Sequence, residues 1–395
     1  MMMTMYKRCI TWLLLWATAQ AQDRVPGIPS IPADGVPLAQ VFDSQVTDPS
    51  EYLRHDNKVY FVWGARSPQQ PQGVIAARYF PSLRNPERQL TIEWYKAHHP
   101  DWIMYQNDRT TPAYGFIYSY GGLAPLDISN PAVRNFYLDT FILPAIKQGY
   151  RMVAMDNVDL ANHPGSAGHF SNGRWVQLYT GKKDDTAFHS AVIGWLQFLS
   201  DHLHPLGVGV CANIKGMSAK PETIMRVMDA VDAWLDETGF THTGKNITDD
   251  AWLKTVALLQ KIAPSRPFIS INQVRGPVAS AAPEQIEWVI GNFLLCRGPQ
   301  SLLAIVGFDT KAAYQRFDYR DEMNVNIGVP TAPARQDASG AWTRSYSRGM
   351  VLVNPSSQAG VKIALPPGKW KTIGGASIRQ EMTLPPASAA VLNKE

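Results

Sequence analysis

The sequence predicts an α/β fold, namely a (β/α)8 TIM barrel followed by a small C-terminal antiparallel β domain. Short apolar segments alternate with segments of helical spacing over about 280 residues, close to the ~250 residues that such a barrel typically needs. After about residue 330 the helical spacing stops, and short apolar runs stand between Pro and Gly turns. That texture is typical of a small antiparallel β module.

The predicted barrel strands are short runs of apolar and β-branched residues. In chain order they span residues 58–65, 102–106, 123–128, 151–156, 208–214, 233–237, 268–272 and 302–306. The clearest helix lies between the fourth and fifth of these strands. Its apolar stripe consists of Phe188, Val192, Trp195, Leu196, Leu199 and Leu203, which recur at helical spacing.

An open, doubly wound sheet is the alternative fold for this alternation of strands and helices. Such a sheet usually carries a glycine-rich phosphate-binding turn after its first strand. Here the first predicted strand is followed by Arg66-Ser67-Pro68-Gln69-Gln70, which contains no glycine. The barrel is therefore favoured.

The N-terminal residues have the pattern of a secretory signal. Lys7 and Arg8 precede an apolar run, and Ala19-Gln20-Ala21 has the small-x-small form of a cleavage site. The run is shorter than the about 20 apolar residues that span a membrane. We therefore expect a mature protein that begins near Gln22, acts in the periplasm or outside the cell, and has no membrane anchor after signal removal.

These observations divide the chain into four regions. Residues 1–21 are the expected signal peptide and residues 22–50 an N-terminal extension. Residues 51–330 form the expected catalytic barrel, and residues 331–395 a C-terminal β-sandwich-like domain. Trp370 in this last region is expected in its core, with carbohydrate binding as the alternative role.

Charge and cysteine content exclude several kinds of partner. The formal net charge of +4 falls by two when Lys7 and Arg8 leave with the signal, which is too small a bias for nucleic-acid binding. Cys211 and Cys296 remain in the mature chain, either as buried thiols or as a single disulfide. No CxxC or Cys/His spacing indicates zinc, so we expect neither a metal nor a cofactor. The sequence leaves the oligomeric state open.

The ends of the predicted strands are unusually polar. In a TIM barrel the catalytic groups lie at the C-terminal ends of the strands, where the βα loops form the mouth. The acids, amides and aromatic residues near these ends, predicted to bind substrate, are Trp63, Tyr105, Asp108, Asp127, Asn157, Asn213, Asp236 and Asn272, and Asp309 follows the last strand. Asp and Asn also cap helices at such turns, but so many on one rim predict a pocket that hydrogen-bonds hydroxyl groups.

Two further carboxyl groups at the strand ends match the needs of glycoside hydrolysis. That reaction uses one carboxylic acid to protonate the leaving oxygen and a second, ionised carboxylate as nucleophile or base. Asp156 ends the fourth predicted strand and Glu237 the sixth. Because alternate strands place side chains in a common layer, the two are expected to face each other across the mouth. Asp159 is expected to cap the turn or to support the residues of the site from behind, rather than to act as a catalyst.

Several longer runs resemble known enzymes. The runs LDISNPAVRNFYLDTFILPAIKQGYRMVAMDNVDL, WYKAHHPDWIMYQND and VLVNPSSQ…LPPASAAVL resemble a broad group of TIM-barrel glycoside hydrolases, the α-galactosidase-like and polygalactosaminidase-like barrels. The resemblance implies that Asp156 is the nucleophile and that Glu237 or its neighbour Asp236 is the acid/base. The chain departs from the group at Arg151-Met152, where a Phe/Tyr-Asp-Gly phrase is usual.

Two functions follow as expectations. The first is a secreted or periplasmic glycoside hydrolase that cleaves a polysaccharide or oligosaccharide, with Asp156 as the nucleophile of a retaining mechanism. The alternative is a catalytically inactive barrel that binds glycan within an export or surface assembly. The acids at the fourth and sixth strands favour the enzyme.

Overall fold

The structure is a computed structural model, and it describes residues 30–42, 58–87, 89–113, 123–158, 160–161, 165–214, 219–308 and 318–395. The expected signal peptide at residues 1–21 and the expected mature N-terminus at Gln22 lie outside these residues. Asp159 and Asp309 lie outside them as well.

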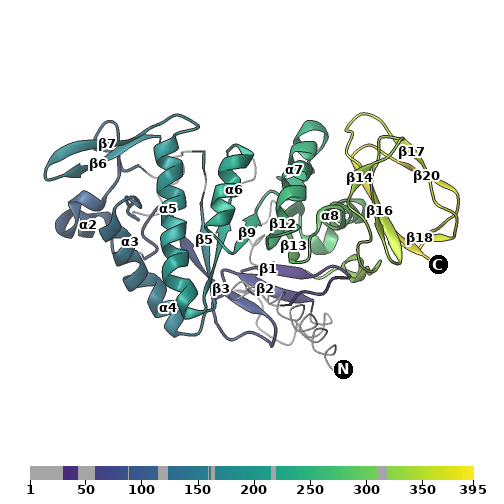
Figure 1. Cartoon of the computed structure of the whole chain (residues 1–395), viewed down its shortest axis with the longest axis horizontal. Coiled ribbons are helices and arrows are strands. Elements are labelled where there is room, and N and C mark those ends of the chain that lie inside the picture. The colour runs from purple at the N-terminus through teal and green to yellow at the C-terminus, as the bar shows by residue number, and fades with distance from the viewer. Residues whose placement is uncertain are drawn as a thin grey trace, which may run out of the picture.

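Eight parallel strands close into a barrel, which confirms the predicted fold class (Figure 1). In spatial order the strands are β1 (Leu38–Val41), β13 (Ser301–Phe308), β12 (Phe268–Arg275), β9 (Ala233–Asp236), β8 (Gly209–Asn213), β5 (Met152–Asp156), β3 (Ile75–Pro81) and β2 (Val59–Trp63). Each neighbouring pair is parallel, so all C-terminal ends meet at one mouth.

Two of the predicted strands are not part of the barrel. Within 102–106 only β4 (Tyr105–Gln106) is a strand, and it belongs to a side sheet. Residues 123–128 make only isolated bridges. The barrel instead uses β1, which lies within the range assigned to an N-terminal extension, and β3, which the sequence analysis missed. An apolar run shows that a segment is buried, but it does not show which sheet buries it.

The helices lie around the outside of the barrel. They are α3 (Pro131–Tyr137), continued by a π-helical turn at Leu138–Ile142 and by α4 (Leu143–Lys147), then α5 (Thr186–Leu203), α6 (Pro221–Asp229), α7 (Asp249–Ile262) and α8 (Pro283–Cys296). At the start of α3 the Asn130 side chain accepts a hydrogen bond from the Ala132 N–H, which satisfies one of the free donors at a helix N-terminus. The described connection between β2 and β3, residues 64–74, contains no helix.

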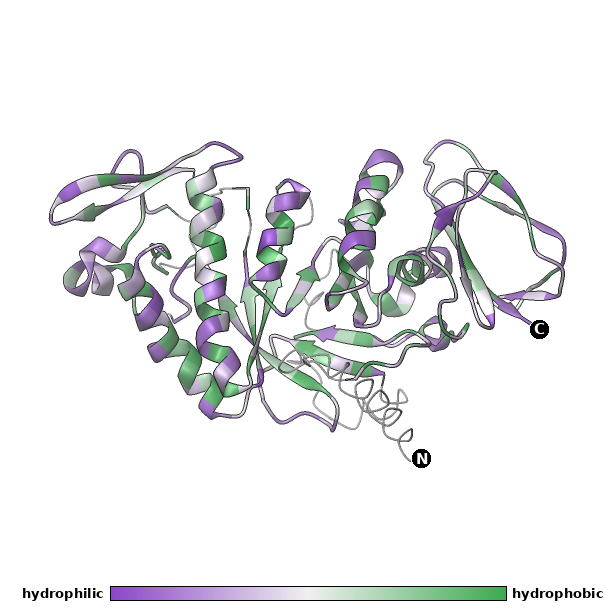
Figure 2. Ribbon diagram, viewed as in Figure 1, coloured by the Kyte–Doolittle hydropathy of each residue, from purple (hydrophilic) through white to green (hydrophobic). Residues whose placement is uncertain are grey.

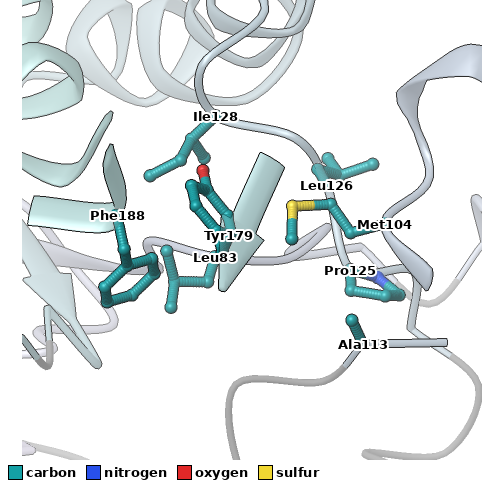
Figure 3. Close-up of a pocket in the computed structure, with 8 residues that line it drawn as sticks. All are labelled: Leu83, Met104, Ala113, Pro125, Leu126, Ile128, Tyr179 and Phe188. Atoms are coloured by element: carbon teal, nitrogen blue, oxygen red, sulfur yellow. The ribbon is translucent and has the colours of Figure 1, made fainter. Parts of the chain in front are cut away.

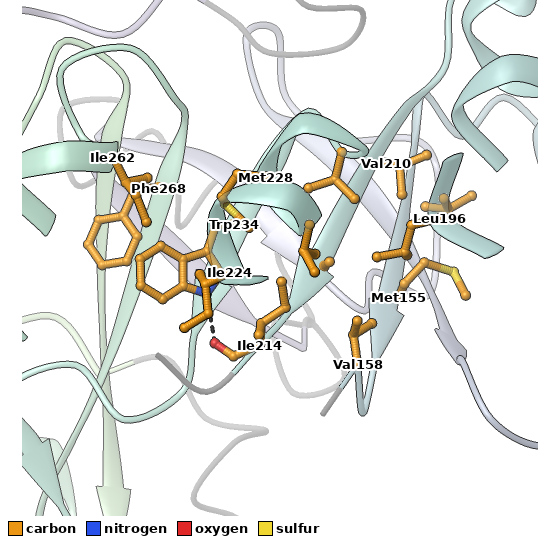
Figure 4. Close-up of a cluster of buried hydrophobic side chains, with 14 of the residues drawn as sticks. Met155, Val158, Leu196, Val210, Ile214, Ile224, Met228, Trp234, Ile262 and Phe268 are labelled. Carbon is orange, nitrogen blue, oxygen red and sulfur yellow. Dashed lines mark hydrogen bonds between the residues drawn. The ribbon is translucent and has the colours of Figure 1, made fainter. Parts of the chain in front are cut away.

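One apolar core fills the space between the barrel and its helices. Figure 4 shows part of it, in which Met155 of β5, Val210 of β8 and Trp234 of β9 face side chains of the surrounding helices. The Trp234 indole N–H donates to the carbonyl of Ile214 at 2.7 Å. In Figure 2 the central strands are coloured mostly hydrophobic, whereas the helices alternate between hydrophobic and hydrophilic residues. Amphipathic helices thus enclose apolar strands, as in other α/β folds.

A second, smaller core fills the barrel interior. It consists of the alternate, inward-facing residues of the strands, which include Phe61, Trp63, Ala77, Met152, Ala154, Cys211, Leu235, Ile269, Ile271 and Ala304. Cys211 lies in this core and Cys296 lies on α8, and both are buried, unpaired thiols. Of the two alternatives for these cysteines, the structure has the free thiols.

A three-stranded side sheet is built from the loops that follow β3 and β5. Its members are β4 from the first loop, and β6 (Ser166–Ser171) and β7 (Arg174–Thr180) from the second. The β6–β7 hairpin projects at the end of the molecule opposite the C-terminal domain (Figure 1). The His169 imidazole Nδ1 lies 3.1 Å from a carboxylate oxygen of Asp127, which connects the two loops.

The C-terminal region forms an antiparallel β domain. It contains a six-stranded sheet in the order β14 (Arg335–Gln336), β15 (Trp342–Tyr346), β16 (Gly349–Asn354), β21 (Ser388–Lys394), β18 (Trp370–Thr372) and β19 (Ser377–Ile378), together with a pair formed by β17 (Val361–Ala364) and β20 (Glu381–Leu384). Trp370 is 5% exposed and lies in the core of this domain, as predicted.

The C-terminal domain packs on α8 of the barrel through specific polar contacts. The Tyr346 hydroxyl and the Arg344 guanidinium donate to main-chain carbonyls at the end of α8. The Val391 N–H donates to the Glu287 carboxylate at 3.0 Å. Among the described residues, no helix is both long and apolar enough to cross a membrane.

Candidate active site

Inward-facing side chains at the barrel mouth form one hydrogen-bonded cluster. Because side chains alternate along a strand, Tyr79 of β3, Asp156 of β5 and Asn213 of β8 project to the same side as the interior core residues two positions before them. Glu237 directly follows β9 and continues the inward positions of Ala233 and Leu235. The closed barrel therefore brings these four side chains together, although their elements are far apart in the sequence.

A single amide group joins the two acids. The Asn213 Nδ2 donates to an Asp156 carboxylate oxygen at 2.7 Å and to a Glu237 carboxylate oxygen at 3.0 Å. The Tyr79 hydroxyl donates to the second Asp156 oxygen at 2.5 Å. As whole residues, Asp156 and Glu237 are both half-buried, at the C-terminal ends of their strands.

The two acids differ in how firmly they are held. Both Asp156 oxygens accept side-chain hydrogen bonds, one from Tyr79 and one from Asn213. The main-chain carbonyl of Asp156 also accepts from the Ser82 N–H at 2.9 Å and from the Ser82 hydroxyl at 2.7 Å. Within the described part of the chain, the Glu237 side chain has one hydrogen bond, from Asn213. Asp156 is thus fixed, while Glu237 keeps one oxygen for another partner.

The pKa of Asp156 reflects opposing influences. Burial raises the pKa of this carboxyl above its ordinary value, and the negative charge of Glu237 raises it further. Hydrogen bonds from Tyr79, Asn213 and the Asn157 main-chain N–H lower the pKa, but burial outweighs them. The direction of the shift alone would favour Asp156 as the proton carrier of the pair. All three donors nevertheless point at the Asp156 carboxylate, and these contacts suit the ionised form, which can only accept hydrogen bonds.

Backbone conformations at the mouth are unusual. Asn157 has a φ of 58° and Phe42, directly after β1, a φ of 57°, a left-handed conformation that is rare for a bulky residue. The Phe42 ring lies 5.8 Å from the Tyr79 ring. A Cβ at position 64 would lie 2.3 Å from a Phe42 ring carbon, so only glycine fits there. Such strain tends to occur at functional sites.

Three of the predicted substrate-binding residues have different positions from those expected. Trp63 points into the barrel but is only 2% exposed, so it forms the floor below the acids. Asp236 and Asn272 face outward, away from the mouth, because they alternate with the inward Leu235 and Ile271. A one-residue difference in register selects the opposite face of a strand.

Three further residues lie in the loops outside the acid cluster. Tyr105 belongs to the side sheet and packs against Phe170. Asp108 lies in an exposed turn and accepts hydrogen bonds from the Thr111 hydroxyl and from the Thr110 and Thr111 main-chain N–H groups, which together lower its pKa to about 2. Asp127 is buried and bonds Ser129 and His169. The contacts of Asp108 and Asp127 are those of turn and loop supports rather than of ligand-binding groups.

Tyr79 is the member of the cluster that the sequence analysis missed. Its strand, Ile75–Pro81, contains Arg78 and ends in a proline, so it did not have the pattern of a buried strand. The signal that could have found it is the alternation of Ile75, Ala77 and Tyr79, which is the inward-facing set.

A small apolar cavity among the described residues lies away from this cluster. It lies between the loops after β3 and β5 and is lined by Leu83, Met104, Ala113, Pro125, Leu126, Ile128, Tyr179 and Phe188 (Figure 3). Its walls are almost wholly apolar and it offers no pair of acids, so it is a packing defect of the core. Within the described ranges, no group of three His, Cys, Asp or Glu side chains could hold a metal ion.

The fold of this chain is similar to that of several solved structures. No family model and no curated protein matches the sequence. Among solved structures, a family GH13_31 enzyme has a TM-score of 0.53 at 10% identity, covering 91% of this chain and 99% of that chain. Eubacterium rectale Amy13B has a TM-score of 0.50 at 11% identity, covering 93% and 97%. The glycoside hydrolase domain of PelA from Pseudomonas aeruginosa has a TM-score of 0.40 at 12% identity, covering 71% and 89%.

The first two similarities span the barrel and the C-terminal domain alike. The chain therefore shares its overall fold with these two structures. At these identities the similarity establishes the fold, and the activity must be argued from the site.

The raised pKa of Asp156 predicts how stability depends on pH. In the folded state this carboxyl binds its proton more tightly than in the unfolded chain, so wild-type stability falls as pH rises through the interval between the two pKa values. Asp156→Asn has no such loss. The variant should match wild type near pH 4 and be the more stable of the two proteins at pH 7.

Chemical denaturation of both proteins between pH 4 and pH 8 measures this difference. Asp139→Asn, at an exposed position, is the control and should follow the wild-type curve. If the Asp156→Asn variant is less stable than wild type at every pH, the pKa of Asp156 is not raised in the folded protein.

Proposed function

We propose that this protein is a glycoside hydrolase that cleaves a polysaccharide or oligosaccharide with Asp156 and Glu237 as its carboxyl pair. The observation that carries the proposal is the Asn213 amide, whose nitrogen lies 2.7 Å from one acid and 3.0 Å from the other. Two facing carboxyl groups at the barrel mouth are the arrangement that glycosidic bond cleavage requires. The fold shared with solved glycoside hydrolases supports the same class.

Asp156 is suited to act as the nucleophile. Tyr79 and Asn213 hold its two oxygens, and Ser82 holds its main-chain carbonyl, so the group is oriented before substrate arrives. Positioning of this kind supplies a large part of a rate enhancement. The ionised carboxylate attacks the anomeric carbon of the bound sugar, and the bond to the leaving oxygen breaks.

Glu237 is suited to act as the acid and then as the base. One oxygen is held by Asn213, which leaves the other to contact the glycosidic oxygen. Glu237 gives its proton to that oxygen as the bond to the anomeric carbon breaks. It then takes a proton from water, which attacks the glycosyl–Asp156 ester and frees the carboxylate.

The spacing of the acids supports retention of configuration. The two hydrogen bonds to one nitrogen limit the separation of the bonded oxygens to the sum of 2.7 and 3.0 Å. Carboxyl groups lie about 5–5.5 Å apart in retaining enzymes and roughly 6.5–9.5 Å apart in inverting enzymes, which leave room for a water molecule. Two acids that share one nitrogen donor are closer to the first arrangement. Direct attack by Asp156 is therefore favoured over attack by water.

Replacement of either acid should abolish hydrolysis without unfolding the protein. Asp156→Asn removes the nucleophilic charge and should lower kcat on the hydrolysed glycan by about 10³-fold or more, which corresponds to roughly 4 kcal/mol at 1.36 kcal/mol per factor of ten. Glu237→Gln should lose a similar factor on glycans. On aryl glycosides of the same sugar it should still release the phenol in an initial burst, because a good leaving group needs no proton. Turnover after the burst should be slow, because hydrolysis of the glycosyl–Asp156 ester still needs Glu237 as the base.

The measurement is release of reducing ends from a panel of polysaccharides, followed by kinetics on the best substrate. Asp139→Asn serves as the matched control and should retain full activity. If Asp156→Asn hydrolyses within tenfold of wild type, the proposed site is wrong. If the wild type binds a glycan from the panel but cleaves none, the protein is a binding barrel rather than an enzyme.

Retention predicts the anomeric form of the first product. With a glycosyl–Asp156 intermediate, two displacements at one carbon leave its configuration unchanged. NMR spectra recorded in the first minutes of hydrolysis should show the anomer of the substrate before mutarotation mixes the two forms. The opposite anomer would mean that water attacks directly and that Asp156 acts as a base.

We propose further that the protein works outside the cytoplasm. Lys7, Arg8, the apolar run and Ala19-Gln20-Ala21 support export with cleavage after residue 21. Mass spectrometry of the protein recovered from the periplasm or medium should give a mature chain beginning at Gln22. Recovery of the full-length chain from the cytoplasm alone would contradict this proposal.

A further inference from the structure

We infer that Asn272 is a positioning residue that holds the turn carrying Glu237, and that it does not touch substrate. The inference rests on the proposed role of Glu237 in hydrolysis. It concerns a side chain on the neighbouring strand β12, whose outward face lies against the turn between β9 and α7.

Asn272 is enclosed on the outer side of the barrel. It is 0% exposed and alternates with the inward Ile271. The ladder between β9 and β12 pairs Asp236 with Ser270, so Asn272 lies just beyond the last paired residues, beside the first residues of the turn. A buried amide in this position must find its hydrogen-bond partners within the protein.

The Asn272 amide connects the turn to the strand. Its Oδ1 accepts a hydrogen bond from the Phe240 N–H at 2.8 Å, and its Nδ2 donates to the Ser270 hydroxyl at 3.0 Å. The second bond orients the amide so that its oxygen faces the turn. The Trp288 indole N–H donates to the Phe240 carbonyl at 3.0 Å, so both main-chain groups of Phe240 are held.

The turn approaches Asn272 too closely for any side chain to lie between them. Gly239 has a φ of +54°, and a Cβ there would lie 2.5 Å from the Ile271 carbonyl oxygen and 2.6 Å from the Asn272 Oδ1. At the other end of the turn, the Asp236 carboxylate accepts from the Thr238 N–H at 3.1 Å. The main chain is therefore held on both sides of Glu237.

Glu237 depends on this support because its own contacts are few. It lies one residue beyond the end of β9, where the strand ladder no longer fixes the main chain. Its side chain has one hydrogen bond among the described residues, from Asn213. A displacement of about 1 Å at a reacting group costs on the order of 10²-fold in rate, so loss of the Asn272 contact should affect catalysis more than substrate binding.

The test is Asn272→Ala in the full-length protein. We expect kcat on the hydrolysed glycan to fall by about 10- to 100-fold, with KM within a factor of three. Hydrogen exchange followed by mass spectrometry should show faster exchange in the peptide that contains Phe240. Ser270→Ala, which leaves the bond to Phe240 in place, should have a smaller effect in the same direction.

The matched control is Asn354→Ala in the C-terminal domain. Asn354 is 1% exposed, and its Nδ2 also donates to main-chain carbonyls. Its loss should lower the melting temperature as much as Asn272→Ala does, with kcat unchanged. Equal kcat losses in the two variants, or wild-type exchange at Phe240 in Asn272→Ala, would overturn the inference.

The exchange measurement does not depend on hydrolysis. If Asp156→Asn shows that the proposed activity is wrong, faster exchange at Phe240 would still establish the support of the turn by Asn272. If Asp156→Asn abolishes activity but Asn272→Ala raises KM and leaves kcat unchanged, then the positioning role fails while the proposed function stands.

Discussion

The site depends on one shared hydrogen-bond donor, the Asn213 amide between Asp156 and Glu237. Two carboxylates this close repel each other, and burial adds to the cost of charging Asp156. A neutral amide with two N–H groups relieves the repulsion without supplying a counter-charge that would fix both acids in the ionised form. An Arg or Lys at this position would stabilise two anions instead, and the acid step of the proposed mechanism would be lost.

Barrel closure makes this arrangement available. The side chains that form the cluster come from different strands, and each occupies the inward position at the C-terminal end of its strand. Below them a layer of apolar residues, with Trp63 as the largest, excludes water from the interior. The packed core thus fixes the positions of the strand ends. The residues that could contact a ligand are confined to the mouth. Strained residues such as Phe42 and Asn157 can be accommodated there because the surrounding strands hold them.

The residues just outside this layer have supporting roles. Asp236, Asn272 and Asp127 have the same chemistry as the cluster, yet each uses its oxygens to hold a turn or a loop. Polar groups gather at strand ends for two reasons, because turns need acceptors for their free N–H groups and because ligands need polar contacts. In this protein, polar residues that support turns alternate along the strands with polar residues that point into the mouth. The supporting residues hold the main chain that carries the cluster.

The sequence by itself determined the barrel, the C-terminal β domain and the two acids, because these follow from local patterns. Apolar periodicity gives the strands from residue 151 onward, and Asp156 and Glu237 each stand directly where such a strand ends. Only the tertiary structure decided which earlier segments close the barrel, because pairing between β1, β2 and β3 depends on contacts distant in the sequence. It also decided the face on which each strand-end residue lies. Neighbouring residues of a strand point to opposite faces of the barrel wall. Asn213 therefore points into the barrel and joins the cluster, whereas Asn272 points outward toward the turn after β9.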